Sequence, residues 1–273
     1  PAVTDVVIQG TNIDNNIQDR INSRLERYVS DRVREEAEQV AGALVDDATV
    51  DAKLAEIPKV DYDRIVALKP DLIVTCAYGQ IVPQALLDIP TYGCLNLHGS
   101  LLPKYRGASP VQSALFNGET KTGITLFKID EGMDTGEIIS QKEIDILPQD
   151  DAETLFNKLI EIAKIELKNF LDIAKSGDFI TKAQEGTPTI APLIEREKTF
   201  LNFTQDDAIT LHNKVRALAV GAPSLAKATT FEGQLVQILK TEIKDLPSNA
   251  PKNLPIGAIV SIERNVGFFV QCK

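Results

Sequence analysis

Tryptophan is absent from this 273-residue sequence, methionine occurs once, and cysteine occurs three times. Cys76, Cys94 and Cys272 are widely spaced, and no C-x-x-C pair suggests a zinc site or a redox dithiol, so we expect no metal. No apolar run approaches the roughly 20 residues of a membrane helix. The N-terminus also lacks the charged and then apolar pattern of a secretory signal. Together these absences predict a protein of the reducing cytoplasm that does not enter a membrane.

Positive charge is scarce, because 29 Lys and Arg stand against 39 Asp and Glu and leave a net charge of −10. That balance argues against a surface that binds nucleic acid throughout. The charge is uneven: residues 197–273 hold nine Lys or Arg and seven Asp or Glu, so this part carries +2 and the remainder −12. A polyanion would therefore meet the least repulsion at the C-terminal part.

What is present is an alternation of strand and helix patterns over the first 175 residues or so. DVVIQG, the run at 71–77 and CLNLH are typical of strands, and apolar residues recur at helical spacing over 16–42 and 151–175. SPVQSALFNGE predicts a short helix with Ser109 as its N-cap. Such an alternation predicts an α/β domain with a mainly parallel sheet.

The pattern changes towards the C-terminus. Residues 178–197 predict a linker, and one helix near 205–218 is followed by short apolar runs separated by Gly, Pro and Asn. These features divide the chain into an α/β domain at 1–177, the linker, and a small β domain at 198–273.

Polar side chains gather at the end of CLNLH. Asn96 and His98 are two residues apart, so both face the same side of that strand. The carboxyl ends of parallel strands open onto the crevice where open α/β proteins bind ligands. Asp134, in the loop DEGMDTG between two later strand patterns, could reach the same crevice. An amide donor, an imidazole and a carboxylate together suit acyl transfer to an amine, with no Ser or Cys nucleophile required.

Each of these residues also has a purely structural interpretation. A single histidine at a strand end is more often structural than catalytic, Asp134 could only shape its turn, and Asn96 could satisfy backbone groups. Lys104 and Arg106, in the next loop, are more often solvated charges than anion ligands. Spacing alone leaves these alternatives open.

A longer stretch carries a family resemblance. NLHGSLLPKYRGASPVQSALFNGETKTGITLFKIDEGMDTGEI resembles the core of the formyltetrahydrofolate-dependent formyltransferases, most closely the members that act on methionyl-tRNA. The Asn-x-His pair, the SLLP loop, the YRG turn and the Asp of DTG all match. KPDLIVTCAYGQIVP resembles the preceding strand and folate-lining loop, and LHNKVRALAVGAPSLAKATTFEGQLVQI resembles the beginning of the C-terminal domain.

The resemblance implies a fold and a reaction. The expected fold is a Rossmann-like formyltransferase domain at 1–177 and a small OB-like β-barrel at 198–273. The implied reaction moves a formyl group from 10-formyltetrahydrofolate to the α-amino group of methionyl initiator tRNA. We expect a monomer whose partners are folate and this tRNA.

The resemblance also assigns residues. Asn96, His98 and Asp134 correspond to the catalytic trio, and Lys104 and Arg106 become candidate tRNA contacts. The SLLP loop implies a cis peptide bond between Leu102 and Pro103. The residues expected to line the folate are Ser100, Leu101, Leu102, Pro103, Tyr78, Gly79, Gln80 and Ile81.

The N-terminus departs from the family. Residues 1–35 contain nothing like the family's opening strand and turn, and VVIQGTNIDNNIQDRINSRLERYVSDR loosely resembles the start of ribosome hibernation factors. We also expect the C-terminal barrel to be shorter than the family's. Two alternatives therefore stay open: a formyltransferase that acts on an amino-sugar nucleotide, and a non-catalytic protein of this fold that binds tRNA or the ribosome.

Overall fold

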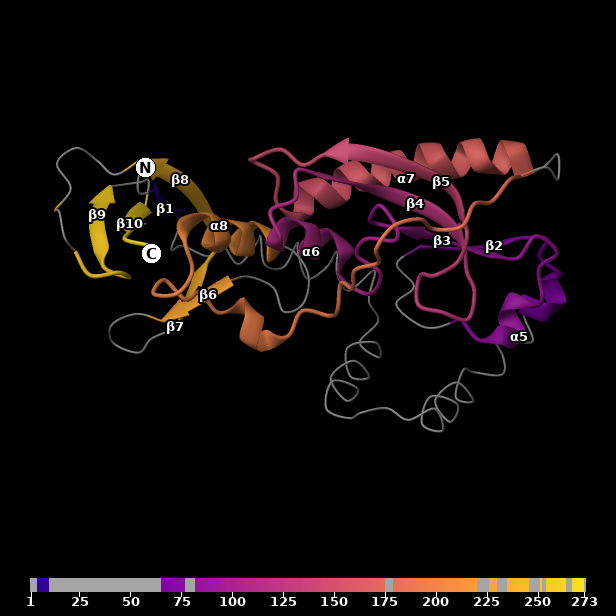
Figure 1. Ribbon diagram of the computed structural model, residues 1–273, viewed down its shortest axis with the longest axis horizontal. Coiled ribbons are helices and arrows are strands. Elements are labelled where there is room, and N and C mark those ends of the chain that lie inside the picture. Colours follow the sequence, from indigo (N-terminus) through magenta and orange to yellow (C-terminus); the bar gives the residue numbers. More distant parts are fainter. Residues whose placement is uncertain are drawn as a thin grey trace. The chain divides into compact units, whose positions relative to one another are not determined.

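The computed structural model describes residues 4–9, 65–76, 82–174, 179–219, 226–229, 235–245, 251, 254–263 and 267–272 (Figure 1). The helix predicted over 16–42 lies outside the described residues. The chain forms two compact units, one of Pro1–Gly10, Ile73–Ile81 and Cys94–Lys273 and the other of Thr11–Leu72 and Val82–Gly93. Within the described part, no helix is both long and apolar enough to cross a membrane.

The second unit contributes two short helical stretches to the described residues, at 65–68 and at 84–87. Helix α5 (Gln84–Leu87) begins after Pro83, and the amide NH of Tyr92 donates to the carbonyl of Asp71. Leu86 is the buried residue of this helix.

The sheet that holds the predicted site has four described strands in the order β2-β3-β4-β5. These are β2 (Ile73–Cys76), β3 (Cys94–His98), β4 (Lys121–Lys128) and β5 (Ile138–Asp145). Strands β2 and β3 are parallel, whereas β3 with β4 and β4 with β5 are antiparallel. The described sheet is therefore mixed, and the prediction of a mainly parallel sheet is wrong for it.

The length of the connections explains the mixed sheet. Helix α6 (Pro110–Phe116), between β3 and β4, has seven residues and so rises about 10 Å. The eight residues of β4 span about 27 Å, so this helix cannot carry the chain back along the sheet for a parallel crossover. A short loop then joins β4 to β5, which makes these two strands antiparallel neighbours.

Helix α7 (Ala152–Ala174) lies along β4 and β5 (Figure 1). It begins where predicted, because the Asp151 carboxylate accepts from the amide NH of Thr154 at 2.9 Å. Its buried side chains recur at helical spacing: Ala152, Leu155, Leu159, Ala163 and Phe170. This packing keeps the interior of β4, residues 122–127, buried.

The C-terminal part contains η1 (Arg196–Thr199), α8 (Ala208–Ala217), β6 (Ala226–Thr229), β7 (Leu235–Ile238), β8 (Lys240–Asp245), β9 (Ile259–Glu263) and β10 (Gly267–Val270). Strands β6 and β7 form an antiparallel pair. The other sheet has the order β8-β1-β10-β9, in which β1 (Thr4–Gln9) is antiparallel to both of its neighbours. The chain thus has an N-terminal mixed α/β sheet and a C-terminal β-rich domain.

The position of β1 differs from the sequence prediction, which placed residues 1–177 together. Thr4 pairs with Asp245 and Gln9 with Lys240, so the first described strand belongs to the C-terminal sheet. No local pattern could indicate this, because the partners are more than 200 residues apart in the sequence. The remaining bounds of the predicted domains stay a prediction.

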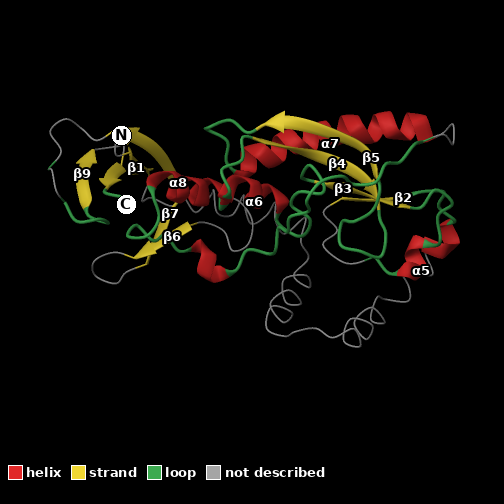
Figure 2. Ribbon diagram, viewed as in Figure 1, coloured by secondary structure: helices red, strands yellow, loops and turns green. Residues whose placement is uncertain are grey.

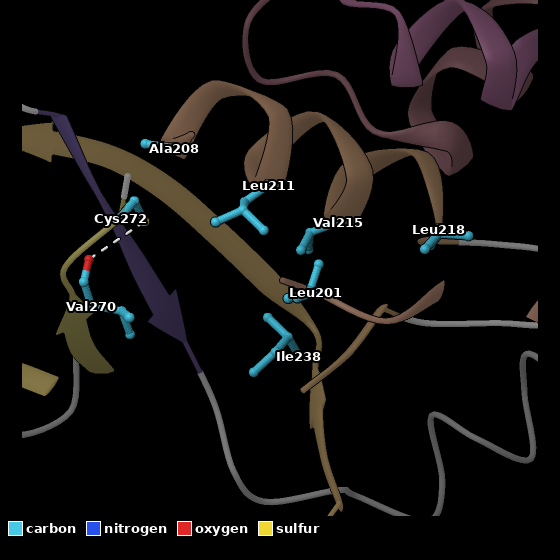
Figure 3. Packing of buried hydrophobic residues seen from close by; sticks show 8 residues of the cluster. All are labelled: Leu201, Ala208, Leu211, Val215, Leu218, Ile238, Val270 and Cys272. Atoms are coloured by element: carbon cyan, nitrogen blue, oxygen red, sulfur yellow. Dashed lines mark hydrogen bonds between the residues drawn. The ribbon is translucent and has the colours of Figure 1, made fainter. Parts of the chain in front are cut away.

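A separate hydrophobic core supports the C-terminal part (Figure 3). It consists of Leu201, Ala208, Leu211, Val215, Leu218, Ile238, Val270 and Cys272. Residues 208, 211, 215 and 218 face the strands because they recur every three or four residues along the chain. Asp207 caps α8 by accepting from the amide NH of Thr210 at 2.7 Å.

Candidate active site

Strand β3 presents Asn96 and His98 on one face, as the sequence predicts. Asn96 lies opposite Thr75 of β2, and the Thr75 hydroxyl donates to Asn96 Oδ1 at 3.0 Å. Leu95 O, 3.1 Å from the same hydroxyl, competes for its proton. With Oδ1 held at Thr75, the Asn96 amide NH₂ group is left to donate to something else. Sequence analysis missed Thr75, whose only signal is a hydroxyl inside the apolar run DLIVTC.

His98 is buried, with a side chain 6% exposed. Its Nε2 lies 2.7 Å from the carbonyl oxygen of Tyr105. A carbonyl can only accept a hydrogen bond, so Nε2 carries a proton. The Phe127 ring packs edge-on against the imidazole, with centroids 6.4 Å apart. These contacts fix the ring and turn Nδ1 towards Asp134.

Asp134 approaches His98 from the loop between β4 and β5. Its Oδ2 lies 3.5 Å from His98 Nδ1, an ion-pair distance longer than a direct hydrogen bond. The same oxygen accepts from the amide NH of Gly107 at 2.8 Å, and Oδ1 has no hydrogen-bond partner among the described residues. The backbone of Asp134 is left-handed, with φ of 53°. The carboxylate therefore points across the site, towards Gly107 and His98, and makes no hydrogen bond within its own turn among the described residues.

The turn itself is shaped by a different carboxylate. Asp130 Oδ1 accepts from the amide NH of Gly132 at 3.0 Å and from the Thr135 hydroxyl at 2.6 Å. The structural interpretation that sequence analysis left open for Asp134 thus fits Asp130 instead.

The path of this loop differs from the expected one. Because β4 runs antiparallel to β3, Lys128 lies opposite Leu95, near the beginning of β3. The loop therefore leaves the sheet about three residues, or roughly 10 Å, from His98 and extends along β3 to meet it. Asp134 and His98 come together as predicted, although by another route. No hydrogen bond or ion pair joins Asn96 to either residue in the described structure.

The SLLP loop is buried and closed by its own hydrogen bonds. The Leu102–Pro103 peptide bond is cis, so that prediction is confirmed. The Ser100 hydroxyl donates to Lys104 O, and Thr125 binds both Ser100 O and the amide NH of Leu102. Ser100, Leu102 and Pro103 are buried, whereas Leu101 is partly exposed. The other expected folate-lining residues, Tyr78, Gly79, Gln80 and Ile81, lie outside the described residues.

The two candidate tRNA contacts differ in their surroundings. Lys104 Nζ lies 3.6 Å from Glu119 Oε1, and its side chain is 58% exposed. Arg106 donates twice to Gln184 Oε1, from Nη2 at 2.7 Å and from Nε at 3.1 Å. Lys104 is therefore accessible to a polyanion, while at least two of the Arg106 donors are already used.

A protein thiolate is not available at this site. Burial raises the pKa of Cys94 to about 11, and burial also raises the pKa of Cys76. Both thiols are protonated at neutral pH, so neither is an activated nucleophile. No group of His, Cys, Asp and Glu among the described residues could hold a metal ion. These side chains thus suit a reaction whose nucleophile comes from the substrate.

Comparison with known proteins identifies the relatives of this chain. A family model described as formyl transferase matches residues 26–170, and a second, described as formyl transferase C-terminal domain, matches residues 193–273. The chain belongs to the formyl transferase family. The residues matched by the first model include Asn96, His98 and Asp134.

Several relatives are methionyl-tRNA formyltransferases. The proteins of Elusimicrobium minutum and Kosmotoga olearia are 42% and 39% identical over 74% and 78% of this chain. That of Thermodesulfovibrio yellowstonii is 40% identical over 71%. The chain covers 66%, 66% and 61% of these three relatives' own lengths, which is less than two thirds of each.

Solved structures agree on the fold. The match to a sugar N-formyltransferase from a Shewanella species covers 78% of this chain and 92% of the other, with a TM-score of 0.57 and 22% identity. The match to methionyl-tRNA formyltransferase from Clostridium thermocellum covers 67% of this chain and 82% of the other, with a TM-score of 0.53 and 21% identity. The match to HypX from Aquifex aeolicus, in complex with tetrahydrofolic acid, covers 77% of this chain and 37% of the other, with a TM-score of 0.59 and 20% identity.

Proposed function

We propose that this chain transfers a formyl group from 10-formyltetrahydrofolate to the α-amino group of methionyl initiator tRNA. One observation carries the chemistry: the Asp134 carboxylate lies 3.5 Å from Nδ1 of a buried, oriented His98. The relatives that are about 40% identical, and named methionyl-tRNA formyltransferases, favour this acceptor.

The proposed reaction begins with the amine. The pKa of an α-amino group is ordinarily about 7.7 to 8.0, so a usable neutral fraction exists at pH 7. Its nitrogen forms a bond to the formyl carbon, and the carbonyl electron pair moves to oxygen. The Asn96 amide and a His98 ring that carries a proton on Nδ1 donate to that oxyanion, while Asp134 Oδ1 takes the proton from the amine. The electron pair then returns, the bond between carbon and folate N10 breaks, and the proton held by Asp134 passes to N10.

The roles follow from how each group is held. Gly107 binds Asp134 Oδ2, so Oδ1 is the oxygen that remains to accept a proton. Thr75 binds Asn96 Oδ1, so the NH₂ group remains to donate. His98 Nε2 is bound to Tyr105 O, so Nδ1 is the atom that faces the charge changes of the reaction.

The donor site is proposed to lie against residues 100–103 and 78–81. Of these two segments the structure describes 100–103, where hydrogen bonds within the protein already use the carbonyl groups of residues 100 to 103 and the amide NH of Leu102. This loop would therefore offer the folate a fixed shape and the partly exposed Leu101 side chain, and few hydrogen bonds. Folate is a separate substrate in this scheme and requires no covalent attachment.

For the acceptor we propose that Lys104 meets the tRNA backbone and that an OB-like C-terminal domain adds weak contacts. Lys104 is exposed, and residues 197–273 carry +2 in a chain of −10. Binding through so few cations should weaken steeply with added salt.

The test incubates the protein with 10-formyltetrahydrofolate and either methionyl initiator tRNA or an amino-sugar nucleotide. Formylmethionyl-tRNA is the expected product. Formylation of the sugar alone would establish the second function, and tRNA binding without turnover would establish a non-catalytic binding protein.

A further inference from the structure

Gln184 lies in the segment that sequence analysis interprets as a linker. Within residues 179–195 the chain forms no helix and only isolated bridges (Figure 2). The Gln184 side chain nevertheless makes four hydrogen bonds. It accepts from Arg106 Nε at 3.1 Å and Nη2 at 2.7 Å, and it donates to the carbonyl oxygens of Asp134 at 2.8 Å and Gly136 at 2.9 Å.

The orientation of this amide follows from its partners. A guanidinium group can only donate, so Gln184 Oε1 faces Arg106, and backbone carbonyls can only accept, so Nε2 faces the loop of Asp134. A flipped amide would place like partners together at all four contacts. The hydrogen-bonding capacity of the side chain is therefore fully used in one orientation.

Residues 182–191, which we call the strap, hold Gln184 in place. At one end Lys182 and Ile138 exchange two backbone hydrogen bonds at 2.8 and 2.9 Å. At the other end Arg106 donates to Thr189 O at 2.9 Å and accepts from Ala191 at 2.7 Å. The strap thus ties the YRG turn to the base of the loop that carries Asp134.

We propose that Gln184 is a positioning residue, which holds the left-handed backbone of Asp134 so that its carboxylate faces His98. This inference rests on the proposed function for its effect on rate, but its structural content is independent of that function. Asp134 has φ of 53°, a left-handed conformation that costs a residue with a side chain some free energy, and contacts from outside the loop offset this cost. Gln184 supplies that contact at the Asp134 carbonyl, and Gly107 supplies the other at the carboxylate.

The amide itself gives a sharp test. Gln184→Glu keeps the acceptors for Arg106 but replaces the two N–H donors with oxygens that face two carbonyl oxygens. Gln184→Met removes all four hydrogen bonds without adding a charge. The matched control is Glu185→Gln, which makes the reverse change at the next residue, whose side chain is exposed.

Two readouts separate positioning from general stability. The first is the split between kcat and KM in the formylation assay. The second is the ¹⁵N spectrum of the histidine rings, which is simple because the chain has only His98 and His212. His212 serves as the internal reference, and the spectrum reports on Asp134 even if the wild-type protein lacks turnover.

Both Gln184 variants should lower kcat by about 10- to 100-fold with KM little changed, the usual cost of a misplaced catalytic group. They should also shift the His98 ring resonances and leave those of His212 in place, whereas Glu185→Gln should change neither readout. Unchanged His98 resonances in both variants would overturn the proposal, whatever the rate. A wild-type protein without formylation activity, together with shifted His98 resonances, would instead contradict the proposed function and support the positioning.

Discussion

His98 lies at the end of β3 with a carboxylate 3.5 Å from its Nδ1, whereas His212 lies on α8 with Arg216 nearby. The first ring bridges a backbone carbonyl and Asp134, and the second binds the Thr241 hydroxyl at 2.9 Å. Burial lowers the pKa of His212, and the charge of Arg216 lowers it further. Neither ring is exposed, so the comparison teaches that the group beside each ring, a carboxylate at His98 and a guanidinium at His212, is what distinguishes the two positions.

The largest effect is expected when the active-site histidine is replaced. His98→Ala should lower kcat for formyl transfer by about 10²- to 10⁴-fold, the usual contribution of a positioned acid–base group. His212→Ala is the matched control and should leave kcat unchanged while lowering the unfolding temperature. Steady-state kinetics of both variants would measure the two effects on kcat. Near-normal formylation by His98→Ala would remove His98 from the mechanism.

A smaller effect is expected where β2 supports the site. Thr75→Val keeps the shape of the side chain but releases Asn96 Oδ1, so the amide loses its fixed orientation. The loss of one hydrogen bond of about 1 kcal/mol should lower kcat by about fivefold. Thr122→Val, at a buried threonine of β4 away from the site, is the control. Equal rates for the two variants would show that Thr75 does not orient Asn96.

The smallest effect concerns the stability of the C-terminal part. The pKa of His212 is lowered in the folded protein, so protons bind the unfolded chain more readily. The stabilisation is complete above the ordinary histidine pKa of about 6.5 and is lost as pH falls below it towards the folded value. Unfolding titrations should therefore show a decline below that pH that becomes shallower in His212→Gln. An identical decline in both proteins would contradict this assignment.

Much of the site could be predicted because its signals are local. The two-residue spacing of Asn96 and His98 fixes their shared face, and Asp151 marks the beginning of α7. The direction of β4 could not be predicted, because a helical pattern between two strands does not reveal whether the chain returns along the sheet.

Other features were hidden because they depend on distant partners. Gln184 lies in a stretch without periodicity, and its four hydrogen bonds all reach residues about 50 or more positions away. Strand β1 finds its neighbours at the other end of the sequence. A sequence pattern indicates which secondary structure a segment can form, but not which distant segment it will pair or hydrogen-bond with.

The most direct test of the account is single-turnover formylation of methionyl initiator tRNA by Asp134→Asn. The amide oxygen can still accept from Gly107, so the loop keeps its anchor, while the proton acceptor beside His98 is lost. We expect the rate to fall by about 100-fold or more, with binding of the formyl donor unchanged. A rate close to that of the wild-type protein would contradict the claim that the Asp134 carboxylate beside His98 accepts the proton of the amine during formyl transfer.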